Sequence, residues 1–195
     1  MAIKVGINGF GRIGRNTLRA AFDGLARRGL LTKSRNRGAF VRVLTPRDLV
    51  EVYELRSAIE IQAGRSLAAQ RSVPEEARRA LAAEQRLTGD SARRDLVEAD
   101  LAFHRAIVDG AGNGRLSAVH RDIAAEIRLS LVQLMETQYA TVEELTAEHA
   151  EVLQAVISGE LDTAEAVIRR HLGAATAWLV SHGTPPSEGE PRPQG

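Results

Sequence analysis

The chain has 195 residues and a mass of 21.1 kDa, with 44% hydrophobic and 26% charged residues. These are ordinary values for a globular protein, and no apolar run reaches the roughly 20 residues that a membrane span needs. The sequence contains no cysteine, which excludes thiolate catalysis, thiolate metal ligands and disulfides. The first residues also lack the pattern of a secretory signal, so a cytoplasmic protein without a membrane segment is predicted.

The net charge of +1 conceals two oppositely charged parts. Residues 1–45 carry ten Lys and Arg and a single acid, Asp23, whereas residues 46–195 carry sixteen bases and twenty-four acids. A basic segment joined to an acidic body is typical of a nucleic-acid-binding module attached to a regulatory domain. A basic face that contacts only solvent is the alternative.

The first motif of the chain is Gly9-Phe10-Gly11-Arg12-Ile13-Gly14, which follows the strand-like residues 3–7. These glycines match the pattern of dinucleotide-binding loops, and residues 2–16 closely resemble the start of glyceraldehyde-3-phosphate dehydrogenase. A dinucleotide site also needs an acidic residue about 20 positions later, and residues 30–36 contain none. We therefore interpret residues 1–14 as a segment foreign to the rest, with an NAD-binding dehydrogenase fragment as an alternative function.

Residues 16–43 alternate between helical and extended patterns. Apolar spacing predicts a helix from Asn16 to Gly29, followed by two extended runs at residues 30–33 and 39–43. The basic residues 34–38 between these runs are predicted to form a hairpin turn. Helix, strand, turn and strand are the second half of a winged helix-turn-helix, which we place at residues 15–44.

From residue 46 onward the apolar residues follow helical spacing almost everywhere. Thr45 is a candidate N-cap with Pro46 in the first turn, and the apolar positions of this helix are Leu49, Val52, Tyr53, Leu55, Ile59 and Ala63. Five more helices are predicted, beginning near Pro74, Ser91, Asn113, Thr141 and Asp162, with ends near Gly110, Met135, Gly159 and His182. The predicted fold is an all-α antiparallel bundle of about six helices at residues 45–182, preceded by the partial winged helix-turn-helix. Residues 183–195 are rich in Pro, Gly, Ser and Glu and are predicted to be a disordered tail.

Three of these predicted helices carry potential metal ligands. Asp100 and His104 lie four residues apart and share one helix face, while His149 and His171 lie mid-helix beside apolar positions. A set of three histidines and one carboxylate suits a divalent Zn, Ni, Mn or Fe ion. The alternative is that each histidine has its own hydrogen-bond partner in the core.

The basic segment resembles the recognition helix and wing of GntR-family transcriptional regulators, through Arg15-Asn16-Thr17-Leu18-Arg19 and Asn36-Arg37-Gly38-Ala39-Phe40-Val41. The resemblance implies that Arg15, Thr17 and Arg19 contact operator DNA in the major groove, and that Arg37 and Gly38 enter the minor groove. That family places further elements before the recognition helix, where this chain has the dehydrogenase-like segment. DNA binding is therefore expected to be weak or absent.

The acidic body resembles the FCD ligand-binding domain of the FadR branch of the GntR family. The resemblance rests on the Glu54-Leu55-Arg56-x-x-x-Glu60 core, Asp100 to His104, Gly112-Asn113, Glu148-His149, and Gly159 through Leu172. It implies that Asp100, His104, His149 and His171 hold a divalent ion that receives a small carboxylate effector, and that the protein is a homodimer. Arg56 and Asn113 are candidate effector-binding residues, although an intrahelical pair of Arg56 with Glu60 is an equal alternative.

The sequence thus predicts a DNA-binding transcriptional regulator that senses a small carboxylate at a metal site and is not an enzyme. A metal-dependent hydrolase is a second alternative. The only candidate general base beside the ligands is Glu148, which is predicted to face another side of its helix from His149.

Overall fold

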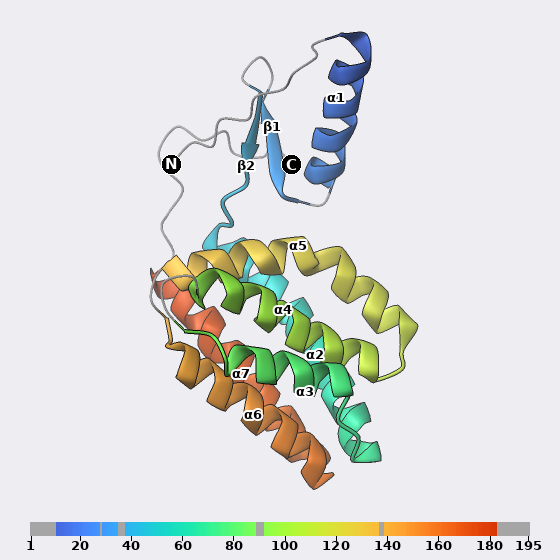
Figure 1. Cartoon of the computed structure of the whole chain (residues 1–195), viewed down its shortest axis with the longest axis vertical. Helices are drawn as coiled ribbons and strands as arrows, with labels where there is room; N and C mark the ends of the chain where they lie inside the picture. Colours follow the sequence, from blue (N-terminus) through green and yellow to red (C-terminus); the bar gives the residue numbers. More distant parts are fainter. Residues whose placement is uncertain (1–10, 28, 35–37, 89–91, 137–138, 183–195) are drawn as a thin grey trace. The chain divides into compact units, whose positions relative to one another are not determined.

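The computed structural model describes residues 11–27, 29–34, 38–88, 92–136 and 139–182 (Figure 1). The chain divides into two compact units, one ending at Arg42 and one beginning at Val43, and each is described here by itself. The predictions for residues 1–10, for the turn at 35–37 with Arg37, and for the tail at 183–195 lie outside the described residues.

The first unit consists of helix α1 (Arg12–Arg27) and a hairpin of β1 (Leu31–Ser34) and β2 (Gly38–Val41). The strands pair antiparallel, from Leu31 opposite Val41 to Ser34 opposite Gly38. The predicted start of the helix at Asn16 was wrong. Arg15 N–H donates to the Gly11 carbonyl at 3.1 Å, so the first turn closes four residues earlier and includes the end of the dehydrogenase-like segment.

No residue described in this first unit is fully buried. The apolar side of α1 leaves Phe22 42% exposed, and the hairpin leaves Phe40 and Val41 exposed as well. A small unit normally depends on a buried apolar core for its stability. Its described residues form the predicted helix and the two paired strands but no such core.

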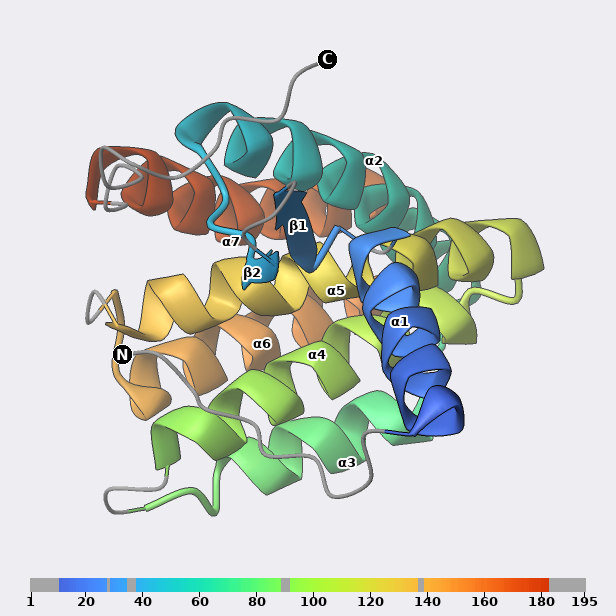
Figure 2. The same ribbon diagram turned by 90° about the horizontal axis from the view of Figure 1, so that it is seen from above.

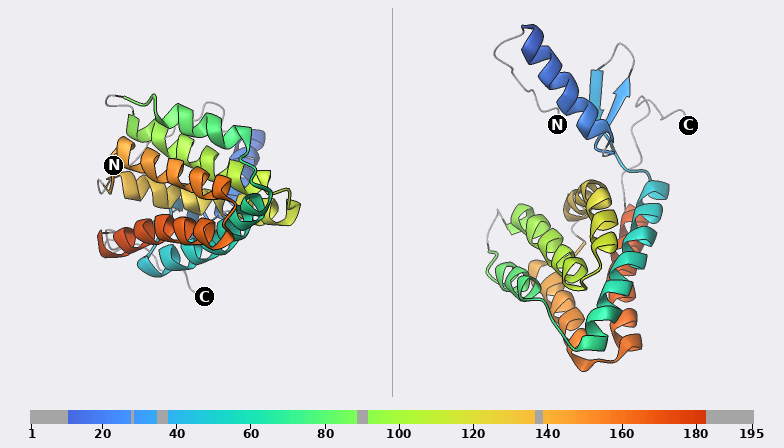
Figure 3. Two further views of the ribbon diagram at one scale, coloured as in Figure 1. Left: turned by 90° about the horizontal axis from the view of Figure 1, so that it is seen from below. Right: turned by 90° about the vertical axis from the view of Figure 1, so that its right-hand side faces the viewer.

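The second unit is a bundle of six helices within the described residues, as predicted (Figures 1 and 2). They are α2 (Pro46–Gln70), α3 (Glu75–Glu84), α4 (Ala92–Gly110), α5 (Gly114–Glu136), α6 (Val142–Ser158) and α7 (Leu161–His182). Helices α2 and α7 lie side by side, α3 packs along α4, and α6 lies between these pairs (Figure 3). Among the described helices, none is both long and apolar enough to cross a membrane.

Local sequence signals fix the starts of two helices. Thr45 forms a capping box with Asp48, and Thr141 forms another with Glu144, so each threonine accepts a backbone N–H while the acid accepts one in return. Helix α6 ends at Gly159, whose φ of 79° is in the left-handed region that favours glycine. These caps explain why the predicted start of α2 and both predicted ends of α6 agree with the structure.

The core of the bundle is centred on the contact between α2 and α7. A Cβ atom added at Gly64 would lie 2.2 Å from Cδ1 of Ile168, so the glycine permits this close approach. Five of the six apolar positions predicted for the first helix of the bundle are buried. The sixth, Leu55, is 41% exposed.

Candidate metal centre

The four residues predicted as metal ligands lie together in the middle of the bundle. Asp100 and His104 come from α4, His149 from α6 and His171 from α7, and all four are buried. Each offers one ligand atom, and these atoms lie within 4.8 Å of one another. The helical spacing of Asp100 and His104 brings both to one face, while the packing of α6 and α7 against α4 brings the other two.

The Nε2 atoms of the three histidines point at a common position. Nε2 of His104 lies 3.2 Å from Nε2 of His149 and 3.2 Å from Nε2 of His171. Oδ1 of Asp100 lies 3.7 Å from Nε2 of His104 and 3.6 Å from that of His149. Two nitrogens bound at about 2.1 Å to one tetrahedral or octahedral ion lie about 3.0–3.4 Å apart, so the spacing fits shared ligation.

Each histidine presents its other ring nitrogen to a carboxylate. Nδ1 of His104 lies 2.5 Å from Glu60, that of His149 lies 2.8 Å from Glu84, and that of His171 lies 2.6 Å from Glu148. Carboxylates in this position orient a metal-binding imidazole and fix its tautomer. The alternative of separate partners is therefore true of the Nδ1 atoms, whereas the Nε2 atoms face one another.

The tautomers of the histidines make the contacts between their Nε2 atoms unfavourable unless a cation lies between them. An ionised carboxylate only accepts hydrogen bonds, so the Nδ1 atoms of His104 and His171 donate and their Nε2 atoms carry lone pairs. These two lone pairs face each other at 3.2 Å with no proton between them. A cation coordinated by both nitrogens would replace this repulsion with attraction, so the donor set fits a metal ion.

The buried charges lead to the same conclusion. Among the described residues, the buried groups include one permanent cation, Arg56, and three acids, Glu60, Glu84 and Asp100. Arg56 balances one of the charges on Glu60 and Asp100. Glu84, whose pKa is raised by burial, adds a second uncompensated charge only when a cation stabilises its carboxylate, and the total then equals the charge of one divalent ion. Burying unpaired charge is costly, so this imbalance favours a bound cation.

The pKa shifts at the site follow from burial and from these neighbours. Burial raises the pKa of Glu84 to about 9, and Asp100 adds to the shift. Burial would also raise the pKa of Glu60, but Arg56 and then His104 outweigh it and hold that pKa well below its usual range. Burial lowers the pKa of His104. Burial also lowers the pKa of His149, and the neighbouring His104 and His171 lower it further, to well below its usual range. Neutral imidazoles of this kind are the form that binds metal ions.

Arg56 is both an ion-pair partner and a source of an unused donor. Its Nε atom donates to Glu60 at 2.7 Å, so the predicted intrahelical pair is present. Its Nη2 atom is buried without a hydrogen-bond partner and lies 3.7 Å from Oδ2 of Asp100, which also lacks one. The guanidinium thus adjoins the ligand cluster, where a free N–H is available to an anionic group.

Asn113, the second candidate for effector binding, has a different environment. It is exposed, and its side-chain oxygen accepts the N–H groups of Arg115 and Leu116 at the start of α5. These contacts are those of a helix cap. None of the contacts described for Asn113 brings it to the four candidate ligands.

Three residues of the site were missed or undervalued from sequence. Glu84 gave no local signal, because His149 lies 65 residues away along the chain. Glu60 was identified only as a partner of Arg56. His120, interpreted from sequence as an ordinary polar position, is 3% exposed with Nε2 lying 3.5 Å from Glu60. Its burial depends on the packing of α5 in the bundle, so no signal in the sequence identified it.

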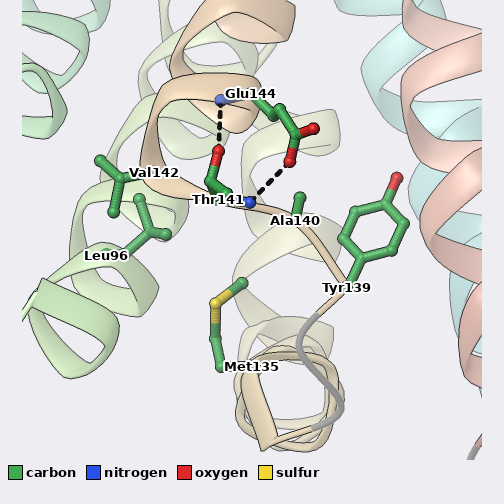
Figure 4. A pocket seen from close by; sticks show the side chains of 7 residues that line it. All are labelled: Leu96, Met135, Tyr139, Ala140, Thr141, Val142 and Glu144. Carbon is green, nitrogen blue, oxygen red and sulfur yellow. Dashed lines mark hydrogen bonds between the residues drawn. The ribbon is translucent and has the colours of Figure 1, made fainter.

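A separate pocket of about 260 Å³ lies where α4, α5 and α6 meet (Figure 4). It is lined by Leu96, Met135, Tyr139, Ala140, Thr141, Val142 and Glu144. The polar atoms of Thr141 and Glu144 are engaged in their capping box, as the dashed lines show (Figure 4). The pocket therefore offers few free polar groups for recognition, and the histidine cluster is the stronger candidate site.

The residues predicted to contact DNA lie in the first unit. Arg15, Thr17 and Arg19 are on α1 and exposed, and the two arginines share a face because they are four residues apart. Gly38 begins β2 with a φ of 96°, a conformation that favours glycine at a turn. The prediction for Arg37 lies outside the described residues.

Comparison with known proteins identifies the family. The FCD domain family matches residues 51–174, more than half of the chain. The chain belongs to the FCD-domain family. Together with its relatives, this match makes it a transcriptional regulator of the GntR/FCD type, as the sequence resemblance implied.

The relatives and structural neighbours agree with this assignment. The chain is 31% identical over 159 residues to the probable D-xylose utilization operon transcriptional repressor of Paenarthrobacter nicotinovorans, covering 80% of this chain and 69% of that protein. It is 34% identical to the Nta operon transcriptional regulator of Aminobacter aminovorans, covering 61% and 57%. A GntR regulator from Rhodococcus sp. RHA1 has a similar structure, with a TM-score of 0.77, 24% identity, and coverage of 87% and 82%. E. coli McbR/YncC has a TM-score of 0.68 at 18% identity, covering 84% and 83%.

The FCD match begins at residue 51, well after the dehydrogenase-like segment, and the described structure disfavours an NAD-binding fragment. A dinucleotide-binding unit follows its glycines and helix with a strand parallel to the first. Here the strand after α1 pairs antiparallel with the next strand, β2. The helix and hairpin have the order of a winged helix-turn-helix.

Proposed function

We propose that this regulator senses a small carboxylate effector at a divalent metal ion held by Asp100, His104, His149 and His171. The observation that carries the proposal is the convergence of three Nε2 atoms and one carboxylate oxygen, each imidazole backed by its own carboxylate. The ion would be Zn, Ni, Mn or Fe, because imidazole and carboxylate ligands suit all four. We assign the sensing role to residues 45–182 and do not assign the chain an enzymatic activity.

Effector recognition would use two kinds of residue, those that orient the histidines and those that contact the carboxylate. Glu60, Glu84 and Glu148 orient the three imidazoles, so their lone pairs stay aimed at one position. A divalent ion bound there supplies positive charge and open coordination positions for a carboxylate oxygen. The unpartnered Nη2 of Arg56 would donate to that carboxylate, since it is buried and adjoins the ligand Asp100. Asn113 is the weaker candidate because its side chain already caps α5.

The sensing step would change the placement of helices around the site. Arg56 and Glu60 belong to α2, whereas His171 belongs to α7, so an effector that contacts both alters their relative position. Regulation then requires different effector affinities in two arrangements of the bundle. A carboxylate that binds both arrangements equally would not regulate.

We also propose that DNA binding, assigned to Arg15, Thr17, Arg19, Arg37 and Gly38 within residues 15–44, is weakened by the atypical N-terminus. The support is the absence of any fully buried residue in the described part of the first unit. A helix that is not held by a core lies in its DNA-binding conformation for only part of the time, which lowers the apparent affinity.

The metal site is tested by elemental analysis of protein purified without a metal-affinity column. We expect about one divalent ion per chain, lost in the His149→Ala, His171→Ala double variant and in Asp100→Asn. His182→Ala is the matched control, because His182 lies on the same helix as His171 but is exposed. A folded protein with no bound metal and no thermal shift on adding Zn, Ni or Mn would refute the site.

Effector recognition is tested on the metal-loaded protein with acetate and with acetamide as the uncharged control. Acetate should raise the midpoint of thermal unfolding and acetamide should not, and Arg56→Gln should weaken the acetate effect.

The proposal of weakened DNA binding is tested by measuring the binding of the protein to a randomised pool of DNA duplexes. Selection of one sequence bound with nanomolar affinity would contradict it.

A further inference from the structure

The pocket between α4, α5 and α6 is not used by the proposed function (Figure 4). Its volume of about 260 Å³ exceeds that of an apolar protein cavity of about 150 Å³ that holds one benzene molecule. Folded proteins pack their interiors closely and leave few voids larger than a water molecule. A space of this size between packed helices is therefore large enough for a ligand.

The inner wall of the pocket is apolar. Leu96 of α4, Met135 of α5 and Val142 of α6 surround one space, and Ala140, just before α6, adds to its wall (Figure 4). Leu96 is 1% exposed and Met135 is 8% exposed, so the pocket narrows toward the core. Water is a poor occupant of such a space because it finds few hydrogen-bond partners there. The wall thus favours a molecule that is itself apolar.

The polar rim of the pocket disfavours anions. The hydroxyl of Thr141 accepts the N–H of Glu144 at 3.1 Å, and the carboxylate of Glu144 accepts the N–H of Thr141 at 2.8 Å. None of the described lining residues is a lysine or an arginine. The exposed carboxylate of Glu144 repels a second negative charge, so a carboxylate effector is not the natural occupant of this pocket.

The pocket and the candidate metal centre share two helix faces. Leu96 lies four residues before Asp100 on α4, so both side chains project from the same face. Val142 lies seven residues before His149 on α6, and seven residues are close to two helical turns. At about 1.5 Å per residue, these spacings correspond to roughly 6–10 Å along the helices. The two sites are thus neighbours that share no residue.

We propose that this pocket binds a small neutral apolar molecule, about the size of one aromatic ring, as a second ligand of the regulator. The molecule fills the space between Leu96, Met135 and Val142 and leaves the capping box at the rim intact. By filling this space it fixes the first turns of α4 and α6 relative to the end of α5. Because α4 and α6 also carry Asp100 and His149, occupancy of the pocket changes the affinity of the metal centre. This coupling rests on the proposed function, whereas the pocket itself does not.

Met135 provides a direct probe of the pocket. The chain has two methionines, Met1 and Met135, so labelling the methionine methyl groups with ¹³C gives few NMR signals, which Met135→Leu assigns. Benzene is the test ligand, because an aromatic ring changes the chemical shift of a methyl group that it contacts. The Met135 signal of the full chain should shift and saturate, with a dissociation constant on the order of 1 mM, while Met1 serves as the reference.

The decisive variant is Ala140→Phe, whose ring occupies the pocket from its own wall. Benzene should bind this variant with a dissociation constant raised at least about tenfold. Ala140→Leu fills less of the space and should weaken binding to a smaller degree, which preserves the test if the larger side chain prevents folding. Ala147→Phe is the control, since Ala147 is exposed on α6 and lies outside the described lining, and it should bind benzene as the unaltered chain does.

Three results would overturn the proposal: a Met135 signal that does not move, one that moves without saturating, or equal responses in Ala140→Phe and Ala147→Phe. Elemental analysis of the same samples separates this proposal from the sensor site. A chain that binds benzene but no metal refutes the sensor site alone, and a chain that holds metal but does not bind benzene refutes the pocket alone. A zinc titration with and without benzene tests the coupling, which an unchanged zinc dissociation constant would refute.

Discussion

The two units of this chain have equally regular backbones but very different interiors. In the second unit large side chains such as Tyr53, Phe103 and Leu179 are at most 1% exposed, and even the charged Arg56 is buried. In the first unit α1 and its hairpin are formed, yet none of their described residues is fully buried. Secondary structure can thus be specified by local pattern alone, whereas stability depends on burial.

The largest expected difference between the units is in the cost of removing one aromatic ring. Phe103 is fully buried and stacks on His149 with ring centroids 4.1 Å apart, so Phe103→Ala should lower the free energy of unfolding by about 3–5 kcal/mol. Phe22 is 42% exposed, so Phe22→Ala should change it by at most about 0.5 kcal/mol. Denaturant unfolding followed by the circular dichroism of the helices, which both units contain, measures both.

Equal effects of the two substitutions would break the comparison. A loss of several kcal/mol from Phe22→Ala would mean that α1 packs against a surface that the description of the first unit does not include. The result expected for Phe103→Ala alone would instead place essentially all measurable stability in the bundle.

A smaller effect is expected from the helix caps. Helix α6 begins with the capping box of Thr141 and Glu144, whereas α1 follows Gly11, which has no side chain to cap it. Thr141→Ala should cost about 1 kcal/mol, because one backbone N–H at the helix start loses its acceptor. Ser181→Ala, whose hydroxyl bonds within its own helix, is the control and should have little effect. The same denaturant unfolding checks both, and an unchanged midpoint for Thr141→Ala would show that water replaces the cap.

The sequence predicted the elements and part of the site for identifiable reasons. Pro46 after Thr45, and Gly159 after an apolar helix, are local signals, so α2 and α6 were placed closely. The spacing of Asp100 and His104 likewise fixes their common face. Leu55 shares this spacing but is exposed, because helical spacing does not show whether a neighbouring helix covers an apolar residue.

The remainder of the site depends on contacts between distant segments. Glu84 meets His149 only because α3 packs against α6, and His120 becomes buried only because α5 crosses the same centre. No local pattern marks either residue, since the sequence around Glu84 and His120 does not show which distant helix covers the position. Charge patterns distinguish the two parts of the chain by sign, but they carry no information on whether a unit has a core.

The last expected effect concerns pH and again reports the second unit alone, since both tyrosines of the chain, Tyr53 and Tyr139, lie there. Burial raises the pKa of Tyr139 to about 12, with a further contribution from Glu148, and burial also raises that of Tyr53. The hydroxyl of an unfolded tyrosine has a pKa of about 10. Between about pH 10 and pH 12, the buried tyrosines of the folded chain therefore keep a proton that the unfolded chain loses. The free energy of unfolding should therefore fall as the pH rises through this window.

Tyrosinate absorbance should stay low at pH 10 in the folded protein and rise only as the bundle unfolds. Tyr139→Phe should reduce the final amplitude of the absorbance change by half. Ordinary titration of either tyrosine near pH 10, with the circular dichroism of the helices unchanged, would show that water reaches its hydroxyl and that the bundle is less closed than its buried residues indicate.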